Sequence, residues 1–209
     1  SLQKVKINYW PNSISKKFPL LKKSIFDKVH AHLGFDHSTL LGANKLKDLS
    51  FYSDNVEIML VNGLRDPILH SSFSKLSDTT MLYTGGGILP KSILSIPQLR
   101  FIHVHPGFLP DIRGADCVLW SAILTGQPSV TCFYMSPGID TGDIIFTCWL
   151  PKVNFNTNNN TFDFKILYQA VFSFFDPWVR SYGLRYLLSK FSEYRTLPAT
   201  PQNLGSGTT

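Results

Sequence analysis

Cysteine is scarce in this sequence, and its scarcity excludes two classes of small protein. Among 209 residues there are three cysteines, Cys117, Cys132 and Cys148. Their number is odd and no two of them form a CxxC pair, which argues against both a disulfide framework and a structural zinc knuckle. We therefore expect a protein of the reducing cytoplasmic compartment.

Long apolar runs are also absent. No stretch approaches the ~20 apolar residues that a membrane-spanning helix needs, and no secretory apolar region opens the chain, so we expect neither a membrane protein nor an exported one. Charged residues make up 16% and hydrophobic residues 44%. This composition favours a globular fold over disorder. The length suits one domain, which we expect to span residues 1–209.

The charge balance is basic, with 20 basic and 14 acidic residues and a net charge of +6. Much of the excess lies in lysines of the first 30 residues. Such a balance can attract phosphates or polyanionic ligands, but it is equally typical of a solvated lysine-rich face. Because no RNA-binding or DNA-binding motif accompanies it, a nucleic-acid partner is not expected.

The middle of the chain alternates strand and helix patterns. We expect strands at 56–61, 79–84 and 100–105, with helices near 67–76 and from Pro90 to about Leu94. Alternation of this kind predicts an α/β fold with a mostly parallel sheet and helices on both faces. Ligands of such sheets bind beyond the carboxyl ends of the strands, here near residues 85–87 and 103–110.

The flanking segments carry weaker patterns. We expect a strand within 1–12, helices at 19–33, 45–53 and 115–125, strands at 129–135 and 144–150, and a surface loop at 154–161. Residues 163–190 predict a long helix interrupted at Asp176-Pro177, because proline breaks a helix interior. The chain thus divides into an opening (1–50), a motif-bearing core (56–150) and a mostly helical tail (151–209).

Two short segments bear chemically active side chains. His103 and His105 are two residues apart at the end of a predicted strand, so both project from the same face. Asp140 lies in the glycine-flanked turn GIDTGD between two predicted strands. Two imidazoles and a carboxylate in a strand-end cleft suit acid–base catalysis. The same set also suits a facial metal site or a purely structural polar cluster, and the spacing alone leaves all three open.

Four ordered motifs lie within residues 81–146. They are GGGILP at 85–90, HPGFLP at 105–110, RGA at 113–115 and GIDTGDI at 138–144. Together they resemble the formyltransferases that use 10-formyltetrahydrofolate, a family that includes glycinamide ribonucleotide, methionyl-tRNA and sugar-nucleotide N-formyltransferases. The resemblance implies the Rossmann-like formyltransferase fold. Residues 1–50 and 151–209 carry little of it, so the opening of the chain is divergent.

The resemblance also assigns catalytic roles. His105 matches the catalytic histidine of the family and Asp140 its catalytic aspartate. His103 stands where the family has an asparagine that donates a hydrogen bond to the formyl oxygen as it becomes an oxyanion. We expect His105, charged through Asp140, to stabilise that oxyanion with His103 assisting as a donor. Asp140, directly or through water, would help to remove the proton of the attacking amine.

Binding residues follow from the same resemblance. The pterin ring of the folate would lie in a pocket formed, largely through backbone atoms, by Ile88, Leu89, Gly138, Ile139 and Gly142. The acceptor substrate would contact two residues of the loop after the second histidine, namely Gly107 and Arg113. The resemblance implies 10-formyltetrahydrofolate as co-substrate and no metal.

Function is expected to be formyl transfer to an amine of a small metabolite, such as an amino-sugar nucleotide. The mostly helical segment 151–209 argues against the transfer-RNA branch, whose members carry an added barrel domain. The alternatives are a formyltetrahydrofolate hydrolase, a folate-binding domain that has lost catalysis, and a metal-dependent enzyme using His103, His105 and Asp140. The oligomeric state stays open and includes a homodimer.

Overall fold

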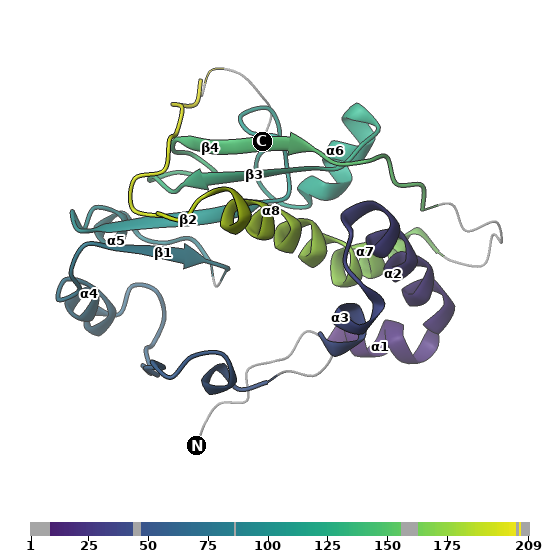
Figure 1. Cartoon of the computed structure of the whole chain (residues 1–209), viewed down its shortest axis with the longest axis horizontal. Helices are drawn as coiled ribbons and strands as arrows, with labels where there is room; N and C mark the ends of the chain where they lie inside the picture. Colours follow the sequence, from purple (N-terminus) through teal and green to yellow (C-terminus); the bar gives the residue numbers. More distant parts are fainter. Residues whose placement is uncertain (1–8, 44–46, 86, 156–162, 204, 206–209) are drawn as a thin grey trace.

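A four-stranded sheet and eight α-helices form an α/β structure in the computed structural model, which describes residues 9–43, 47–85, 87–155, 163–203 and 205 (Figure 1). The described strands are β1 (Thr79–Tyr83), β2 (Leu99–His105), β3 (Ser129–Tyr134) and β4 (Ile144–Trp149). The described helices are α1 (Tyr9–Lys17), α2 (Pro19–Leu33), α3 (His37–Gly42), α4 (Pro67–Phe73), α5 (Lys91–Leu94), α6 (Cys117–Thr125), α7 (Phe164–Phe174) and α8 (Asp176–Lys190), with a 3₁₀ turn η1 at Leu49–Phe51.

The sheet is mixed, so the expectation of a mostly parallel sheet is wrong for the part of the chain that the structure describes. The strand order is β1-β2-β3-β4, and β1 pairs with β2 in parallel. Both β2 with β3 and β3 with β4 are antiparallel. In the register of β2 and β3, His105 lies opposite Thr131, so β3 begins at the end where β2 finishes. Helix α6 stays at that end instead of returning along the sheet, and the next strand therefore runs the opposite way.

The predicted strand at 56–61 is also wrong. These residues are irregular, and Ile58 and Leu60 are 79% and 77% exposed. A short apolar run forms a buried strand only where it joins a sheet. Residues 56–61 pair with none of the described strands. The expected strand in 1–12 lies partly outside the described residues, and its last residues belong to α1.

Most other elements match the expected positions because their local signals are strong. Helix α2 has proline in its first turn and ends at Gly34, whose φ of 66° is a left-handed conformation that favours glycine. Asp66 caps α4 by accepting a hydrogen bond from the backbone N–H of Ile68. The break at Asp176-Pro177 separates α7 from α8, as expected. The predicted helix at 45–53 is reduced to η1, and residues 156–161 of the predicted loop lie outside the described residues.

Helices cover both faces of the sheet. Alternate residues of β2 face opposite sides, so Ile102 and Val104 join a core cluster with α2, α7 and α8, whereas Leu99 and Phe101 join a second cluster with α4 and α5. The side chains of His103 and His105 share the face of Phe101 by the same alternation. In the described residues no helix is both long and apolar enough to cross a membrane.

Candidate active site

The loop that leaves β2 is held against the neighbouring strand by a buried threonine. The Oγ1 atom of Thr131 on β3 donates a hydrogen bond to the carbonyl of Gly107 at 2.6 Å and accepts one from the N–H of Leu109 at 3.1 Å. A buried hydroxyl that is satisfied on both sides fixes the backbone around it. The turn after the two histidines is therefore set by the sheet itself.

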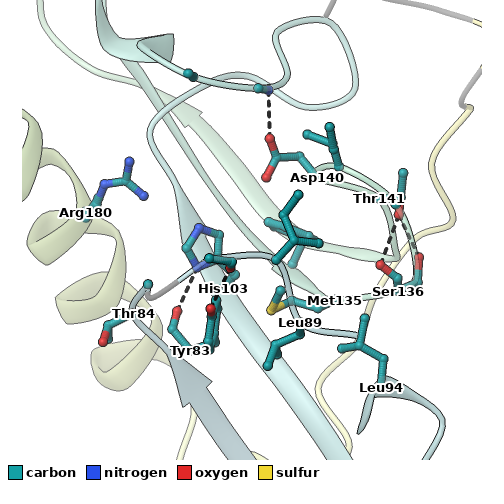
Figure 2. A pocket seen from close by; sticks show the side chains of 18 of the residues that line it. Tyr83, Thr84, Leu89, Leu94, His103, Met135, Ser136, Asp140, Thr141 and Arg180 are labelled. Atoms are coloured by element: carbon teal, nitrogen blue, oxygen red, sulfur yellow. Dashed lines mark hydrogen bonds between the residues drawn. The ribbon is translucent and has the colours of Figure 1, made fainter. Parts of the chain in front are cut away.

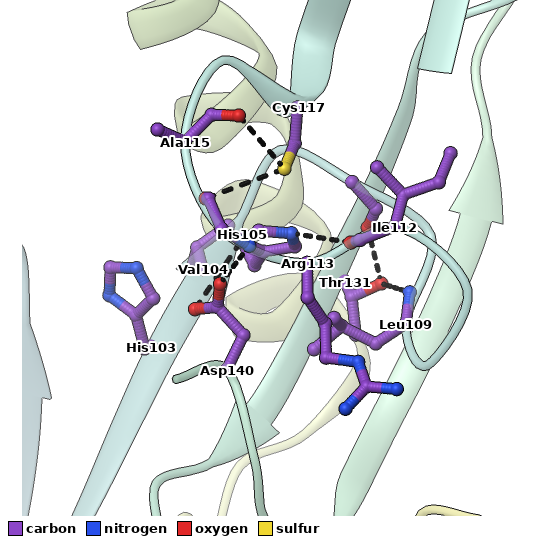
Figure 3. Close-up of polar contacts among 12 residues, drawn as sticks. His103, Val104, His105, Leu109, Ile112, Arg113, Ala115, Cys117, Thr131 and Asp140 are labelled. Carbon is purple, nitrogen blue, oxygen red and sulfur yellow. Dashed lines mark hydrogen bonds and ion pairs between the residues drawn. The ribbon is translucent and has the colours of Figure 1, made fainter. Parts of the chain in front are cut away.

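His105 lies beneath this turn and is engaged at both ring nitrogens. Its Nε2 atom is 2.9 Å from the carbonyl oxygen of Ile112, and its Nδ1 atom is 3.5 Å from Oδ1 of Asp140 (Figure 3). A carbonyl can only accept, so Nε2 carries a hydrogen and Nδ1 faces the carboxylate. Burial lowers the pKa of His105, and the charge of Asp140 opposes that shift. The pair forms a contact through which one proton can be shared.

Asp140 reaches His105 because its loop is folded by unusual backbone angles. Its φ is 51°, a left-handed conformation that aspartate tolerates better than most residues. Gly142 has a φ of 114°, and a Cβ there would collide with the carbonyl of Tyr134. Gln202 donates hydrogen bonds to the carbonyl oxygens of Asp140 and Gly142 at 3.1 and 2.6 Å. The backbone N–H of Gly114 donates to Oδ2 of Asp140 at 2.7 Å.

His103 is held from the other side, by β1. Its Nδ1 atom lies 2.7 Å from the carbonyl oxygen of Tyr83 (Figure 2). The ring packs edge-on against Phe133, with ring centroids 5.8 Å apart. Burial lowers the pKa of His103, and the hydrogen bond to Tyr83 opposes that shift.

A cavity of about 730 Å³ opens beside His103 and Asp140. That volume is typical of small-molecule sites. The wall combines the glycine-rich turn after β1, the 138–141 loop and the start of α8 (Figure 2). Its lining residues are Tyr83, Thr84, Gly85, Gly87, Ile88, Leu89, Leu94, His103, Gly114, Ala115, Phe133, Met135, Ser136, Gly138, Ile139, Asp140, Thr141, Phe172, Asp176, Pro177 and Arg180.

Seven of the ten residues expected at the site are placed around this cavity or directly behind it. Those on its wall are His103, Asp140, Ile88, Leu89, Gly138 and Ile139, and His105 lies behind it in contact with Asp140. His105 is only 2% exposed, so the expectation that it meets the oxyanion directly does not fit its position. It can act only through the carboxylate beside it.

The other three expected residues lie off the wall. Gly142 shapes the loop but does not line the cavity, and Gly107 is buried behind His105. Arg113 donates from Nε to the carbonyl of Pro110 and lines a separate pocket of about 420 Å³ beside Trp120. The neighbours of Gly107 fill the space around it, so it lies away from the cavity wall, and its contact with the acceptor substrate stays a prediction.

Two charged residues at the cavity were not expected from the sequence. Arg180 of α8 donates from Nε to Asp176 at 2.7 Å and from Nη1 to the carbonyl of Val104 at 3.1 Å. Its guanidinium group thereby reaches the end of β2, beside His103 (Figure 2). The only signal in the sequence is the spacing of Asp176 and Arg180, which are one helical turn apart at the start of a predicted helix, and this spacing is common in ordinary surface helices.

The geometry gives no support to a metal site. Within the described ranges, no group of three His, Cys, Asp or Glu side chains is arranged to hold a metal ion. Both nitrogens of His105 already face oxygen acceptors, and Nδ1 of His103 is bound to a carbonyl. Acid–base chemistry is therefore the reading that these contacts favour.

Gly107→Ala is expected to disturb the site without touching the cavity. A Cβ there would lie 2.5 Å from Nε2 of His105 and 2.8 Å from the carbonyl oxygen of Ile112, so His105 must move. Overpacking of this kind costs about 1–3 kcal/mol. We expect a lower melting temperature and a loss of activity. Gly42→Ala is the control, since nothing lies within 4 Å of its Cβ position; equal melting temperatures for the two variants would contradict this prediction.

An imidazole–carboxylate pair behind a cavity, at the end of a sheet strand, is an arrangement that α/β enzymes use for group transfer. Residues 62–162 match the family described as formyl transferase.

Curated relatives share this part of the chain. Over 95 residues it is 38% identical to the methionyl-tRNA formyltransferase of Syntrophus aciditrophicus, covering 44% of this chain and 30% of that protein. Over 121 residues it is 36% identical to the methionyl-tRNA formyltransferase of Clostridioides difficile, covering 56% of this chain and 38% of that protein. The match thus spans about a third of the length of these relatives.

Among solved structures, a formyltransferase from Anoxybacillus kamchatkensis is 22% identical, with a TM-score of 0.39. The similarity covers 73% of this chain and 70% of that one. That protein was solved in complex with UDP-4,6-dideoxy-4-formamido-L-AltNAc and tetrahydrofolate.

Proposed function

We propose that this protein transfers a formyl group from 10-formyltetrahydrofolate to an amine. The observation that carries the proposal is the contact of 3.5 Å between the buried His105 and Asp140, whose carboxylate lies on the wall of a cavity large enough for a folate head group. The match of residues 62–162 to the formyl transferase family supports the same chemistry.

The reaction needs a negatively charged group on the cavity wall, close to the attacking amine. The amine nitrogen attacks the formyl carbon, a C–N bond forms, and the carbonyl electron pair moves to oxygen. The nitrogen gains positive charge as it attacks, and the carboxylate of Asp140 stabilises that charge. His105 and the N–H of Gly114 hold the carboxylate in place, so it needs no reorganisation during the reaction. His105 is a positioning residue in this account.

The folate fits the apolar half of the cavity. Ile88 is 74% exposed at its rim, so its apolar side chain is available to a ligand in the cavity. The hydroxyl of Tyr83 donates to the carbonyl of Gly87 at 2.6 Å and steadies the turn that carries Ile88. A flat pterin ring can lie between this turn and the 138–141 loop, with hydrogen bonds to backbone groups.

The acceptor that we propose first is an amine of a small metabolite, such as an amino-sugar nucleotide. A second candidate is methionyl-tRNA, favoured by the names of the curated relatives that match this chain. Water is the third acceptor, which would make the protein a formyltetrahydrofolate hydrolase. The three reactions share the same folate site and differ only in what enters beside Asp140.

Following the release of tetrahydrofolate tests all three. The protein is incubated with 10-formyltetrahydrofolate alone, with amino-sugar nucleotides, or with methionyl-tRNA. Release that depends on a sugar nucleotide supports our first candidate, release that depends on the tRNA supports the second, and release without an amine supports the hydrolase. Folate binding with no release in any arm would contradict the proposed activity and favour a binding domain that has lost catalysis.

A further inference from the structure

The hydrogen bond between His103 and Tyr83 determines which nitrogen of the imidazole carries a proton. The acceptor is a backbone carbonyl oxygen, which has no hydrogen to give, so Nδ1 of His103 is the donor at 2.7 Å. A neutral imidazole has one N–H. In the neutral ring, Nε2 is therefore bare and carries a lone pair.

That lone pair is available in the cavity. Nδ1 is turned toward Tyr83, His103 lines the cavity, and Nε2 makes no hydrogen bond within the described part of the chain (Figure 2). By contrast, both carboxylate oxygens of Asp140 are already engaged, one by His105 and one by the N–H of Gly114. Nε2 of His103 is thus an acceptor on the cavity wall that has no partner among the described residues.

The surroundings keep the ring of His103 neutral near physiological pH. Burial is the largest influence and lowers its pKa, and the charge of Arg180 on α8 acts in the same direction. The carbonyl of Tyr83 on β1, Asp140 on its loop and Asp176 on α8 oppose the shift. His105, the neighbouring group on β2, is itself affected by burial and lies behind Asp140. The net direction is a pKa below the ordinary value.

A neutral ring with a bare Nε2 cannot donate a hydrogen bond into the cavity. The expectation that His103 replaces the family's asparagine as an oxyanion donor therefore conflicts with the orientation of the ring. We infer that His103 is instead the proton acceptor of the reaction, taking a proton at Nε2 from the attacking amine. This inference rests on the proposed function, because it names the residue that completes the same reaction.

The proton balance closes with this assignment. After attack, the former amine nitrogen bears one proton too many, and Nε2 of His103 takes it to form an imidazolium. The oxyanion then reforms the carbonyl, the bond between the formyl carbon and N10 breaks, and its electron pair stays on N10. The imidazolium returns the proton to N10. The products are the formylated amine and tetrahydrofolate, and His103 is neutral again.

Nitrogen NMR of the protein with ¹⁵N-labelled histidine tests the tautomer without any need for activity. At about pH 7.5 we expect His103 to show a protonated Nδ1 and a bare Nε2. The two ring-nitrogen signals are assigned to His103 by their absence from the spectrum of His103→Asn. A protonated Nε2, in a neutral ring or an imidazolium, would overturn the inference.

The pH dependence of kcat/KM tests the catalytic role. If His103 is the acceptor, activity is full above its lowered pKa and falls as the pH drops through it. His103→Asn keeps a donor but cannot take a proton, so we expect it to lower the rate ~100-fold and to lose this acidic limb. External imidazole should restore part of the activity of His103→Ala. His70→Asn, at an exposed position on α4, is the matched control.

Failure of this inference can be distinguished from failure of the proposed function. An asparagine variant that is as active as the wild type would show that a donor is what this position needs, and the inference would fail while the proposed function stands. An acidic limb that persists in His103→Asn would place the titrating group elsewhere and also overturn it. If the wild type transfers no formyl group to any acceptor, the proposed function fails and the catalytic role of His103 falls with it, while the NMR result still decides the tautomer.

Discussion

Asp140→Asn lowers the rate of formyl transfer at least ~100-fold while the fold is retained, if Asp140 acts through its negative charge. The asparagine side chain has nearly the same size. Its carbonyl oxygen can still accept from the N–H of Gly114, and its amide N–H can donate to Nδ1 of His105, which lies 3.5 Å from the carboxylate in the native pair. The loop therefore keeps its contacts and only the charge is lost.

The measurement is kcat and KM for 10-formyltetrahydrofolate, together with the melting temperature. We expect the loss in kcat, since the charge acts on the attacking nitrogen more than on the bound folate. Asp143→Asn is the matched control, because Asp143 is an exposed carboxylate three residues further along the same loop and should lose little activity. A folded Asp140→Asn protein with wild-type kcat would contradict the role given to this carboxylate.

His105→Ala is expected to reduce both stability and activity. The side chain is 2% exposed, and its removal leaves a cavity, the carbonyl of Ile112 without a donor and Asp140 without its neighbour. Losses of this kind cost about 2–5 kcal/mol of folding free energy. Activity should fall at least ~100-fold, because Asp140 loses the group that positions it.

His105→Gln separates the two effects. A glutamine amide can replace Nε2 as the donor to Ile112, but it cannot also place a nitrogen beside Asp140. We therefore expect this variant to recover much of the lost melting temperature and little of the lost activity. If the glutamine variant recovered the melting temperature and the activity in parallel, His105 would have a structural role only. The role given to it in positioning Asp140 would then be wrong.

The ends of several helices are the part of the fold that sequence reasoning predicts well. Local signals suffice where the chain itself carries them: Pro19 and Gly34 bound α2, Asp66 caps α4, and Asp176-Pro177 separates α7 from α8. The convergence of His105 and Asp140 was also expected, because the resemblance to formyltransferases supplies spatial information that spacing alone lacks. Their roles stay predictions until the variants are measured.

Other features depend on contacts between distant segments, which no local pattern reports. The direction of β3 follows from where α6 folds, and the apolar run at 56–61 is irregular because no described strand pairs with it. Arg180 reaches the cavity only because its Nη1 binds the carbonyl of Val104, 76 residues earlier in the chain. The bare Nε2 of His103 follows from a bond to Tyr83 on another strand. These are the features on which the proposed chemistry depends most.

A crystal structure with tetrahydrofolate bound tests the central claim most directly. We expect the pterin between the turn that carries Ile88 and Leu89 and the loop at 138–141, with N10 turned toward Asp140 and Nε2 of His103. Folate seated elsewhere, for instance in the pocket beside Arg113 and Trp120, or an N10 that points away from both side chains, would contradict the account.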